Sequence, residues 1–236
     1  MRLTGVGVGP GDPDLVTVKA VKVLERADGV FVPTRSEHAC GHAERIVTTY
    51  VDAAKVRRLV FALSADRAAR ERSWDAAGLA LVDALRAGRH AAFATIGDPN
   101  VYSTFTYLAE TVRRLAPDVT ITTVPGITAL QDLAARSGTV LTEGTQTLAL
   151  VPLTAGTQQL AGALARHDTV AVYKGGSDMA RIRTLLDAAG RLPEAVFGTQ
   201  VGLDGEQIGA LPDGGDAPYL STVIVRRPRG ERGAAL

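Results

Sequence analysis

The sequence predicts an α/β protein in which two domains follow one another along the chain. Short apolar runs, typical of buried strands, alternate with segments of helical periodicity along most of the 236 residues. Several of these runs end in loops rich in Gly and Pro, as strands do where α/β sheets bind ligands. Hydrophobic residues make up 46% of the chain and charged residues 22%, which is typical of a soluble globular protein with a sizeable core.

The first half predicts a parallel sheet with helical crossovers. The expected strands, which are short apolar or β-branched runs, lie at 2–8, 29–33, 56–63, 90–94 and 120–124. The expected helices, which carry apolar residues at helical spacing, lie at 18–27, 43–51, 68–87 and 101–115. Thr17 is the expected N-cap of the first helix. The apolar stripe of the third helix consists of Trp74, Ala77, Leu81 and Leu85.

The second half begins with an expected helix at 127–136, which Gly138 ends. Further strands are expected at 147–153, 169–173, 195–199, 207–211 and 219–225, with helices at 157–165 and 178–188. The turn at 212–216 is too short for a crossover helix, so the last two strands are expected to pair antiparallel at an edge of the sheet. The tail at 227–236 has no pattern. We place the domains at 1–124 and 125–236.

Composition narrows the classes of partner. Lys and Arg number 26 against 25 Asp and Glu, so no bulk field favours nucleic acid. A single Cys excludes an internal disulfide framework and fits a reducing cytoplasm. The first residues carry one Arg and then a loop rich in Gly and Pro, which does not fit a signal peptide. No apolar run approaches the length that spans a membrane, so a cytoplasmic protein with no membrane partner is expected.

The turn Gly97-Asp98-Pro99 lies between the expected strand at 90–94 and the expected helix at 101–115. Glycine frees the backbone of such a turn, and the aspartate can bond the amides that follow it. A loop at the carboxyl end of a strand that opens into a helix is where α/β sheets bind ligands. An ordinary connection between a strand and a helix explains the pattern equally well.

A second loop of this kind, at 5–13, contains four Gly and two Pro. It does not fit the dinucleotide motif G-x-G-x-x-G, because the third glycine position is Pro10 counted from Gly5 and Asp12 counted from Gly7. Pro10 and Pro13 also prevent a helix from starting within the loop. The loop can therefore approach a ligand closely, but it is not a cradle for a pyrophosphate.

Three loop motifs, taken in order, resemble those of the tetrapyrrole (class III) methyltransferases. They are G-V-G-V-G-P-G-D-P at 5–13, G-D-P at 97–99 and V-P-G-I-T at 124–128. The string G-D-P-N-V-Y-S-T-F-T-Y-L at 97–108 is most similar to the precorrin-2 C20-methyltransferases of cobalamin synthesis. The string at 61–67, followed by S-W-D-A-A at 73–77, resembles the same branch. The resemblance covers residues 2–226, nearly the whole chain.

The resemblance implies two α/β domains with a cofactor cleft between them, and methyl transfer from S-adenosylmethionine to C20 of a reduced tetrapyrrole. The positions that match the cofactor-binding segments of the family are Pro10, Ile96, Gly97, Asp98, Val101, Thr128, Ala129, Tyr173, Lys174 and Val201. Asp98 could place its carboxylate near the ammonium group of the cofactor, or it could cap its own turn.

This chemistry needs few side chains, because the sulfonium is already a good leaving group and the protein has mainly to orient the reactants. Tyr102 is the candidate for orienting or deprotonating the substrate. Arg35, Arg45 and Lys174 are candidates for binding the substrate carboxylates. The resemblance also implies a homodimer, and three apolar residues of the helix after the turn suggest spare surface for it. These are Phe105, Tyr107 and Leu108.

His38, Cys40 and His42 form a cluster that Glu37 and Glu44 flank. Without a clear fourth ligand, a polar surface loop is favoured over a metal site, and a loop on the substrate side is a third interpretation. Two other functions stay open. One is a different methylase of this superfamily, acting on another ring carbon or on diphthine, and the other is a non-catalytic module that binds a nucleotide-like ligand. The sequence also leaves open whether the substrate is metal-free precorrin-2 or its cobalt complex.

Overall fold

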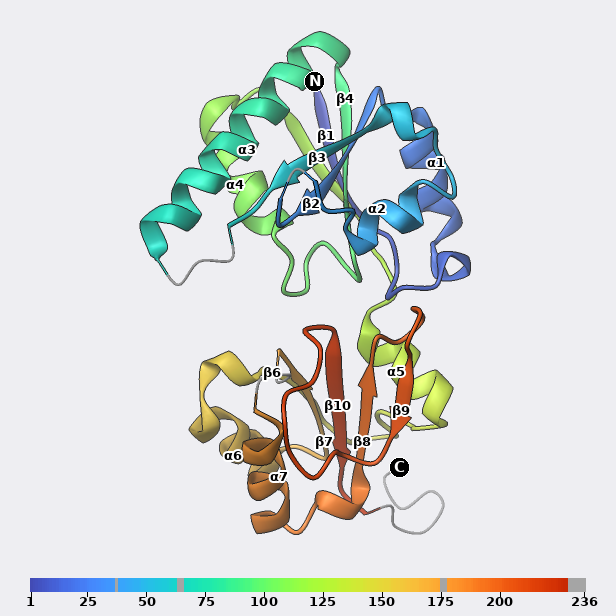
Figure 1. Cartoon of the computed structure of the whole chain (residues 1–236), viewed down its shortest axis with the longest axis vertical. Helices are drawn as coiled ribbons and strands as arrows, with labels where there is room; N and C mark the ends of the chain where they lie inside the picture. Colours follow the sequence, from blue (N-terminus) through green and yellow to red (C-terminus); the bar gives the residue numbers. More distant parts are fainter. Residues whose placement is uncertain (37, 63–65, 175–177, 229–236) are drawn as a thin grey trace. The chain divides into compact units, whose positions relative to one another are not determined.

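The structure, a computed structural model, describes residues 1–36, 38–62, 66–174 and 178–228 of the chain. It divides into two compact units, Met1–Thr128 (unit 1) and Ala129–Leu236 (unit 2). Each unit has its own sheet and its own apolar core (Figure 1). The domain division at 124/125 stays a prediction from the pattern of elements. Some predicted features lie outside the described residues, namely Glu37 beside the histidine cluster, residues 63–65 of the 61–67 string and residues 229–236 of the tail.

The described residues of unit 1 form a five-stranded parallel sheet, as the sequence predicts. Its strands are β1 (Arg2–Gly7), β2 (Gly29–Thr34), β3 (Val56–Val60), β4 (His90–Thr95) and β5 (Thr120–Val124). The spatial order is β3-β2-β4-β1-β5. Because the strands are parallel, their carboxyl ends share one edge of the sheet. The loops that follow β4, β1 and β5 therefore start side by side.

Helices cover both faces of this sheet (Figure 1). They are α1 (Val18–Arg26), α2 (His42–Val47), α3 (Arg67–Gly88) and α4 (Phe105–Leu115). On one face, Leu24 of α1 and Ile46 of α2 share a core cluster with Val30. On the other face, Leu81 of α3 and Leu108 of α4 pack with Phe93. The predicted N-cap of α1 is confirmed, since Thr17 Oγ1 accepts a hydrogen bond from Ala20 N at 3.1 Å.

Helix α4 begins at Phe105, so the prediction that it starts at residue 101 is wrong. Tyr102 has a φ of +50°, and a right-handed helix cannot include a residue in the left-handed region. Helix α2 is also shorter than predicted, because the chain after Val47 continues as turns. The hydroxyl of Thr48 donates to the carbonyls of Glu44 and Arg45 at 3.0 Å, a contact that competes with the helix.

The described residues of unit 2 form a mixed five-stranded sheet in the order β6-β7-β10-β8-β9. Its strands are β6 (Leu148–Pro152), β7 (Thr169–Tyr173), β8 (Ala195–Thr199), β9 (Gln207–Gly209) and β10 (Ser221–Arg226). Helix α5 (Ala129–Ser137) covers one face, where Leu133 packs against Ile224. Helices α6 (Thr157–Arg166) and α7 (Met179–Ala188) pack with residues of the other face, such as Val223.

The prediction that the last two strands pair with each other is wrong. Strand β10 lies between β7 and β8 and runs antiparallel to both, whereas β9 pairs with β8. The segment 210–220 is long enough to carry the chain past β8. The burial of Ser221–Val225 also fits a central strand, because such a strand is covered on both faces.

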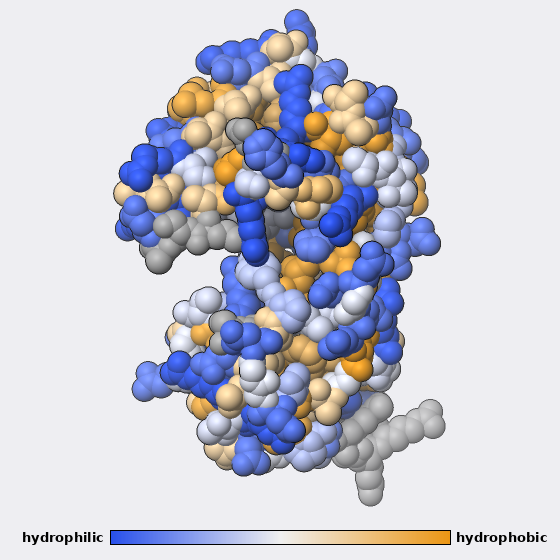
Figure 2. Space-filling view, viewed as in Figure 1, coloured by the Kyte–Doolittle hydropathy of each residue, from blue (hydrophilic) through white to orange (hydrophobic). Residues whose placement is uncertain are grey.

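Hydrophilic residues cover much of the surface of each unit that Figure 2 shows. In the described part of the chain, no helix is both long enough and apolar enough to cross a bilayer. Two residues on which the predicted dimer surface depended, Phe105 and Leu108, are 3% and 0% exposed and belong to the core of unit 1. Tyr107 is 46% exposed and stacks on Trp74, with ring centroids 4.4 Å apart. Helix α4 therefore has less spare apolar surface than the sequence indicates.

Candidate functional site

Three glycines from three loops touch one another at the carboxyl edge of the unit 1 sheet. Gly7 ends β1, Gly97 follows β4 and Gly126 follows β5. A Cβ placed on Gly126 would lie 2.1 Å from the Gly97 carbonyl oxygen and 2.8 Å from Gly7 Cα. A Cβ on Gly7 would lie 2.5 Å from the same oxygen. Since atoms do not approach so closely, Gly7 and Gly126 must be glycines here, and we call the three residues the glycine junction.

Backbone hydrogen bonds join the first two loops of the glycine junction. Val8 N donates to Thr95 O at 3.0 Å, and Gly97 N donates to Gly9 O at 2.7 Å. Gly9 and Gly97 thereby form an antiparallel bridge just beyond the ends of two parallel strands. Their φ values are +78° and +69°, which glycine adopts without strain. The reversal of direction at this bridge depends on both glycines.

The carboxylate of Asp98 links the second loop to the third. Its Oδ1 accepts a hydrogen bond from Asn100 N at 2.8 Å, which is the turn cap that the sequence left open as an alternative. Its Oδ2 accepts from Gly126 N at 3.0 Å, a contact that sequence reasoning missed because it joins residues 28 positions apart. Hydrogen bonds to a charged acceptor are the stronger kind. The side chain of Asp98 therefore stabilises the glycine junction by linking the second loop to the third.

The junction leaves Gly97 open on one side. A Cβ placed on Gly97 would have one described atom within 4 Å, Thr128 Cα at 3.9 Å. Ile96, Val101 and Thr128, which the family resemblance assigns to the same site, are partly exposed in unit 1. Gly97 itself is buried, but the space beside its Cα holds few described atoms, so a small group of a ligand fits on this side. We call this space, between Gly97 and Thr128, the cradle. A single methyl group on Gly97 would already fill part of it.

Tyr102 and Ser103 fix the entry into α4. Ser103 is buried; its Oγ donates to Thr95 Oγ1 and accepts from Phe105 N, both at 3.1 Å. Tyr102 is 44% exposed, and partial burial raises the pKa of its phenol above the ordinary value. The phenol is therefore protonated at neutral pH, so it is suited to donate a hydrogen bond and unsuited to remove a proton.

A hydrogen bond from Tyr50 stabilises the first loop, at residues 5–13. The Tyr50 hydroxyl donates to Pro13 O at 2.6 Å, and the Asp12 carboxylate accepts from Asp14 N at 2.9 Å. A short 3-10 turn over Pro13–Leu15 follows, and the α-helix begins at Val18 as predicted. Pro10, assigned to the cofactor by resemblance, is buried within this loop. Tyr50 carries no sequence signal for this role, because its partner is 37 residues away.

Arg35 and Arg45, the two residues of unit 1 expected to bind the substrate carboxylates, both affect the pKa of His42. Partial burial of the His42 ring and then the charges of Arg45 and Arg35 lower its pKa, although the residue as a whole is exposed. Both arginines are exposed, and Arg35 directly follows β2. Glu44 instead forms a two-bond ion pair with Arg58, at 2.7 and 2.8 Å. The structure therefore brings Arg35 and Arg45 into one cationic segment, whereas Lys174 lies in unit 2.

The cluster at His38, Cys40 and His42 is exposed, and Cys40 Sγ donates to Gly41 O at 3.8 Å. Among the side chains that the structure describes, no group of three or more His, Cys, Asp or Glu is arranged to hold a metal ion.

The remaining residues assigned to the cofactor lie in unit 2. Ala129 begins α5, and the others lie at the carboxyl ends of β7 and β8. Tyr173 ends β7, and Lys174 follows it with a φ of +56°. Gln200 follows β8 with a φ of +50°. Backbone strain at non-glycine residues often accompanies functional sites. Val201 is 5% exposed and its side chain packs into the α5 cluster, so a ligand there would meet its backbone.

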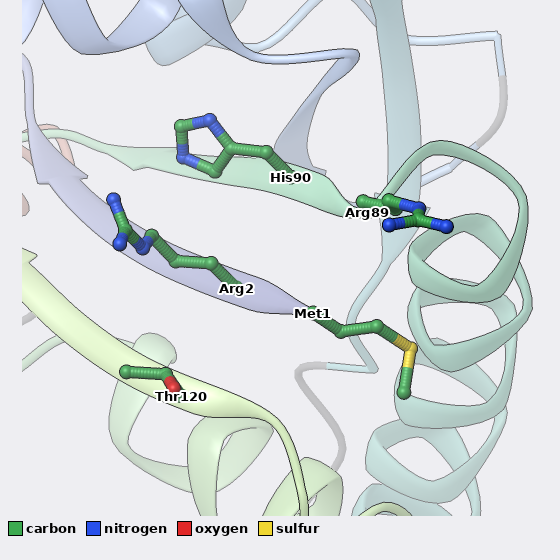
Figure 3. A pocket seen from close by; sticks show the side chains of 5 residues that line it. All are labelled: Met1, Arg2, Arg89, His90 and Thr120. Atoms are coloured by element: carbon green, nitrogen blue, oxygen red, sulfur yellow. The ribbon is translucent and has the colours of Figure 1, made fainter.

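A hollow of about 340 Å³ lies at the opposite edge of the unit 1 sheet (Figure 3). The side chains that line it come from the amino ends of β1, β4 and β5 and from the residues just before β1 and β4. They are Met1, Arg2, Arg89, His90 and Thr120. The sequence assigns no role to these residues, and the hollow is separated from the glycine junction by the length of the strands.

Comparison with known proteins adds to this geometry. Residues 2–212 match the family model of the tetrapyrrole (corrin/porphyrin) methylases. A cobalt-precorrin-2 C(20)-methyltransferase of Salmonella typhimurium is 33% identical, over 96% of this chain and 96% of its own. A precorrin-2 C(20)-methyltransferase of a Sinorhizobium species is 32% identical, over 95% and 94%. The uroporphyrin-III C-methyl transferase of Thermus thermophilus, solved with S-adenyl homocysteine, superimposes with a TM-score of 0.68 at 22% identity, over 96% and 97%. The predicted fold is confirmed.

The glycine junction predicts different costs for two alanine substitutions. Gly126→Ala forces a Cβ into the backbone of Gly97 and should destabilise unit 1 by about 3 kcal/mol or more. Gly97→Ala has room for its Cβ and should cost only the left-handed backbone strain, about 1–2 kcal/mol. Trp74 is the single Trp and lies in unit 1, so its fluorescence during urea unfolding reports on that unit alone. Equal midpoints for the two variants would contradict the junction.

Proposed function

Because the chain belongs to the tetrapyrrole (corrin/porphyrin) methylase family, we propose that it is a methyltransferase that methylates C20 of precorrin-2 in cobalamin biosynthesis. The observation that carries the proposal is the likeness, over nearly the whole length of both chains, to two relatives named for this reaction. The methyl donor is S-adenosylmethionine, which tetrapyrrole methylases use. The open side of Gly97, at the carboxyl edge of a parallel sheet, is compatible with that donor.

In unit 1, the donor would be bound largely by backbone. The residues that we assign to it there are Pro10, Ile96, Gly97, Asp98, Val101 and Thr128, which the glycine junction groups along one sheet edge. The Asp98 carboxylate already accepts two amide hydrogen bonds, so we assign it mainly to shaping this loop. A side chain at Gly97 would fill the cradle, which is a physical reason for glycine there.

In unit 2, we assign Ala129, Tyr173, Lys174 and Val201 to the same donor, on the strength of the resemblance. The strained backbone at Lys174 and next to Val201 supports a functional role for both strand ends. The burial of the Val201 side chain supports contact through its backbone.

When bound, S-adenosylmethionine supplies an electrophilic methyl group on a sulfonium that leaves readily. The protein then has to orient the acceptor carbon and keep water out, which needs positioning more than acid or base chemistry. The Tyr102 phenol is protonated at neutral pH, so we assign it the orienting role, as a hydrogen-bond donor to the substrate. We name no residue as a general base.

Arg35 and Arg45 are the side chains that we assign to the substrate carboxylates, with Lys174 from unit 2. Guanidinium groups bind carboxylates through paired, charge-assisted hydrogen bonds. The two arginines lie in one segment, near enough to His42 for both charges to lower its pKa. That segment follows β2, on the same sheet edge as the glycine junction.

Metal-free precorrin-2 and its cobalt complex are both candidate substrates, because the relatives named for each are 32% and 33% identical to the chain. A methylase for another ring carbon, or one resembling diphthine synthase, is the alternative.

We place the enzyme in the cytoplasm, because a chain with a single cysteine, Cys40, fits a reducing compartment. Recovery from a membrane or secreted fraction of the source cells would argue against this.

Methyl transfer is tested by incubating the chain with S-adenosylmethionine and either precorrin-2 or cobalt-precorrin-2. We expect a product heavier by one methyl group, and labelled methyl should be found at C20 by carbon NMR. The variant Gly97→Ala tests the cofactor site. It should keep its fold and bind S-adenosylhomocysteine about tenfold more weakly, because its added methyl group fills part of the space beside Gly97. Label at another ring carbon would move the chain to the alternative, and no transfer to either substrate would refute the proposal.

Loss of Arg35 or Arg45 should weaken substrate binding without affecting the methyl donor. We expect Arg45→Ala and Arg35→Ala each to raise the KM for the tetrapyrrole about tenfold, since each removes a charge-assisted contact to a carboxylate. The dissociation constant for S-adenosylhomocysteine should stay unchanged. Arg26→Ala, an exposed arginine that ends α1 near the other sheet edge, is the control. An unchanged KM in both variants would remove these residues from the substrate site.

We also expect a homodimer, as the resemblance implies. Light scattering at micromolar concentration should give about twice the chain mass of 24.7 kDa. Tyr107→Ser then tests whether the exposed Tyr107 face of α4 takes part, because removing its ring should shift the equilibrium toward monomer. A monomeric wild type would refute the dimer itself.

A further inference from the structure

Charged side chains of unit 2 form a chain of contacts from helix α5 to the loop after β8. Arg136 Nε donates to Asp132 Oδ1 at 2.8 Å, within α5. Arg136 Nη1 lies 3.2 Å from Glu206 Oε2, and the same oxygen accepts a hydrogen bond from Gly202 N at 2.7 Å. We call the contact of Arg136 with Glu206, together with the bond to the Gly202 amide, the loop clasp.

The helix end of the loop clasp is fixed by a buried charge. Asp132 is 5% exposed, and its Oδ2 has no hydrogen-bond partner among the described residues. A buried carboxylate is stable only with an opposite charge beside it, so Asp132 holds the Arg136 guanidinium in place. Arg136 therefore presents its Nη1 group to Glu206 from a defined position.

The loop at the other end of the clasp has a backbone that local bonds alone do not determine. Gln200, Gly202 and Gly205 have φ values of +50°, +74° and +87°. Two turn bonds, from Leu203 N to Gln200 O at 2.9 Å and from Glu206 N to Leu203 O at 3.1 Å, are the local contribution. A left-handed conformation at a non-glycine residue such as Gln200 persists only where its surroundings impose it. Two further bonds supply such constraints: Gln200 N donates to Leu220 O at 2.9 Å, and Gly202 N donates to the Glu206 carboxylate at 2.7 Å.

The backbone of this loop is also the part that a ligand can meet. The Val201 side chain lies in the core cluster of α5, and a Cβ on Gly198 would lie 2.5 Å from Leu133 Cδ1 and 2.9 Å from Val201 Cγ2. With the side chain of Val201 packed so tightly inward, recognition at this strand end depends on how the peptide groups of residues 200–202 are oriented. The loop clasp sets that orientation.

We propose that the loop clasp positions the backbone of residues 200–202 for S-adenosylmethionine, so that Glu206 and Arg136 are positioning residues. The inference rests on the proposed function, because it takes the backbone of Val201 as a cofactor contact. Partly exposed ion pairs contribute little to the stability of a fold. A clasp with a structural role alone therefore changes stability slightly and binding not at all, whereas a positioning clasp changes binding strongly.

Glu206 is the residue to change. Glu206→Ala opens the clasp and leaves the pair of Asp132 and Arg136 intact, whereas loss of Arg136 would strand the buried carboxylate and risk unfolding. Glu206→Gln keeps an acceptor for Gly202 N and loses the charge that Arg136 meets. Asp213→Ala is the matched control, since Asp213 pairs with Arg183 at 3.2 Å in the same unit and is 96% exposed.

Binding of S-adenosylhomocysteine to the full chain is measured by calorimetry, beside steady-state kinetics and hydrogen exchange. Glu206→Ala should raise the dissociation constant and the KM for S-adenosylmethionine about tenfold, with kcat changed less than about twofold. Glu206→Gln should raise both about threefold, and Asp213→Ala should match the wild type. Amide exchange at 200–206 should be faster in Glu206→Ala, while the melting midpoint falls by less than about 3 °C.

Unchanged exchange at 200–206 in Glu206→Ala would overturn the proposal, because the clasp would then not order the loop. Faster exchange with unchanged affinity would also overturn it, because the ordered loop would then not meet the cofactor. A wild-type chain that does not bind S-adenosylhomocysteine would refute the proposed function and the cofactor step together. The exchange data would still decide separately whether the loop clasp orders residues 200–206.

Discussion

Direct contact between three peptide backbones, with no side chain between them, sets the carboxyl edge of unit 1. Neighbouring strands of a sheet lie about 4.8 Å apart, and the loops that leave them normally diverge to make room for side chains. At the glycine junction they do not diverge, because Gly7 and Gly126 have no Cβ that would strike the carbonyl of Gly97. Asp98 then fixes the third loop to the second through the Gly126 amide. These contacts tie the three loops to one another, so their backbones form a surface that is organised without a ligand.

Much of the fold could be predicted from the sequence, because burial imposes local patterns. Strands such as β5, β7 and β8 follow from apolar or β-branched runs, and their predicted bounds match the structure. The start of α4 could not be predicted, since Tyr102 adopts a positive φ next to Ser103, whose hydroxyl is bound to the distant Thr95. The position of β10 in the sheet could not be predicted either. A turn motif predicts where the chain reverses, but it does not predict which strand the next segment pairs with. The residues of the glycine junction lie within recognisable motifs, but their contacts join positions far apart in the chain.

Backbone and side chains have different tasks in the candidate site. Side chains that pattern and resemblance assign to a ligand turn out to be engaged in shaping loops, as Asp98 is with two amides and Val201 is with the core of unit 2. The groups that remain available to a ligand are then oriented peptide groups. Such groups bind a polar molecule without the entropy cost of ordering long side chains. Arg35 and Arg45 are exposed in the segment after β2, and their proposed role is to bind the carboxylates of the substrate through their guanidinium groups.

The central place of β10 has a consequence for how the protein is made. In unit 2, β6 pairs with β7 and β8 pairs with β9, and these two ribbons join only through β10, the last strand in the described sequence. While a ribosome is still translating the preceding residues, β7 and β8 each present an open hydrogen-bonding edge. Open edges invite pairing with other nascent chains, which is a recognised route to aggregation. Unit 1 has no such dependence, since all of its strands precede unit 2 in the order of synthesis. Premature termination before β10 should therefore yield a chain whose first half is folded and whose second half is a target for chaperones and proteases.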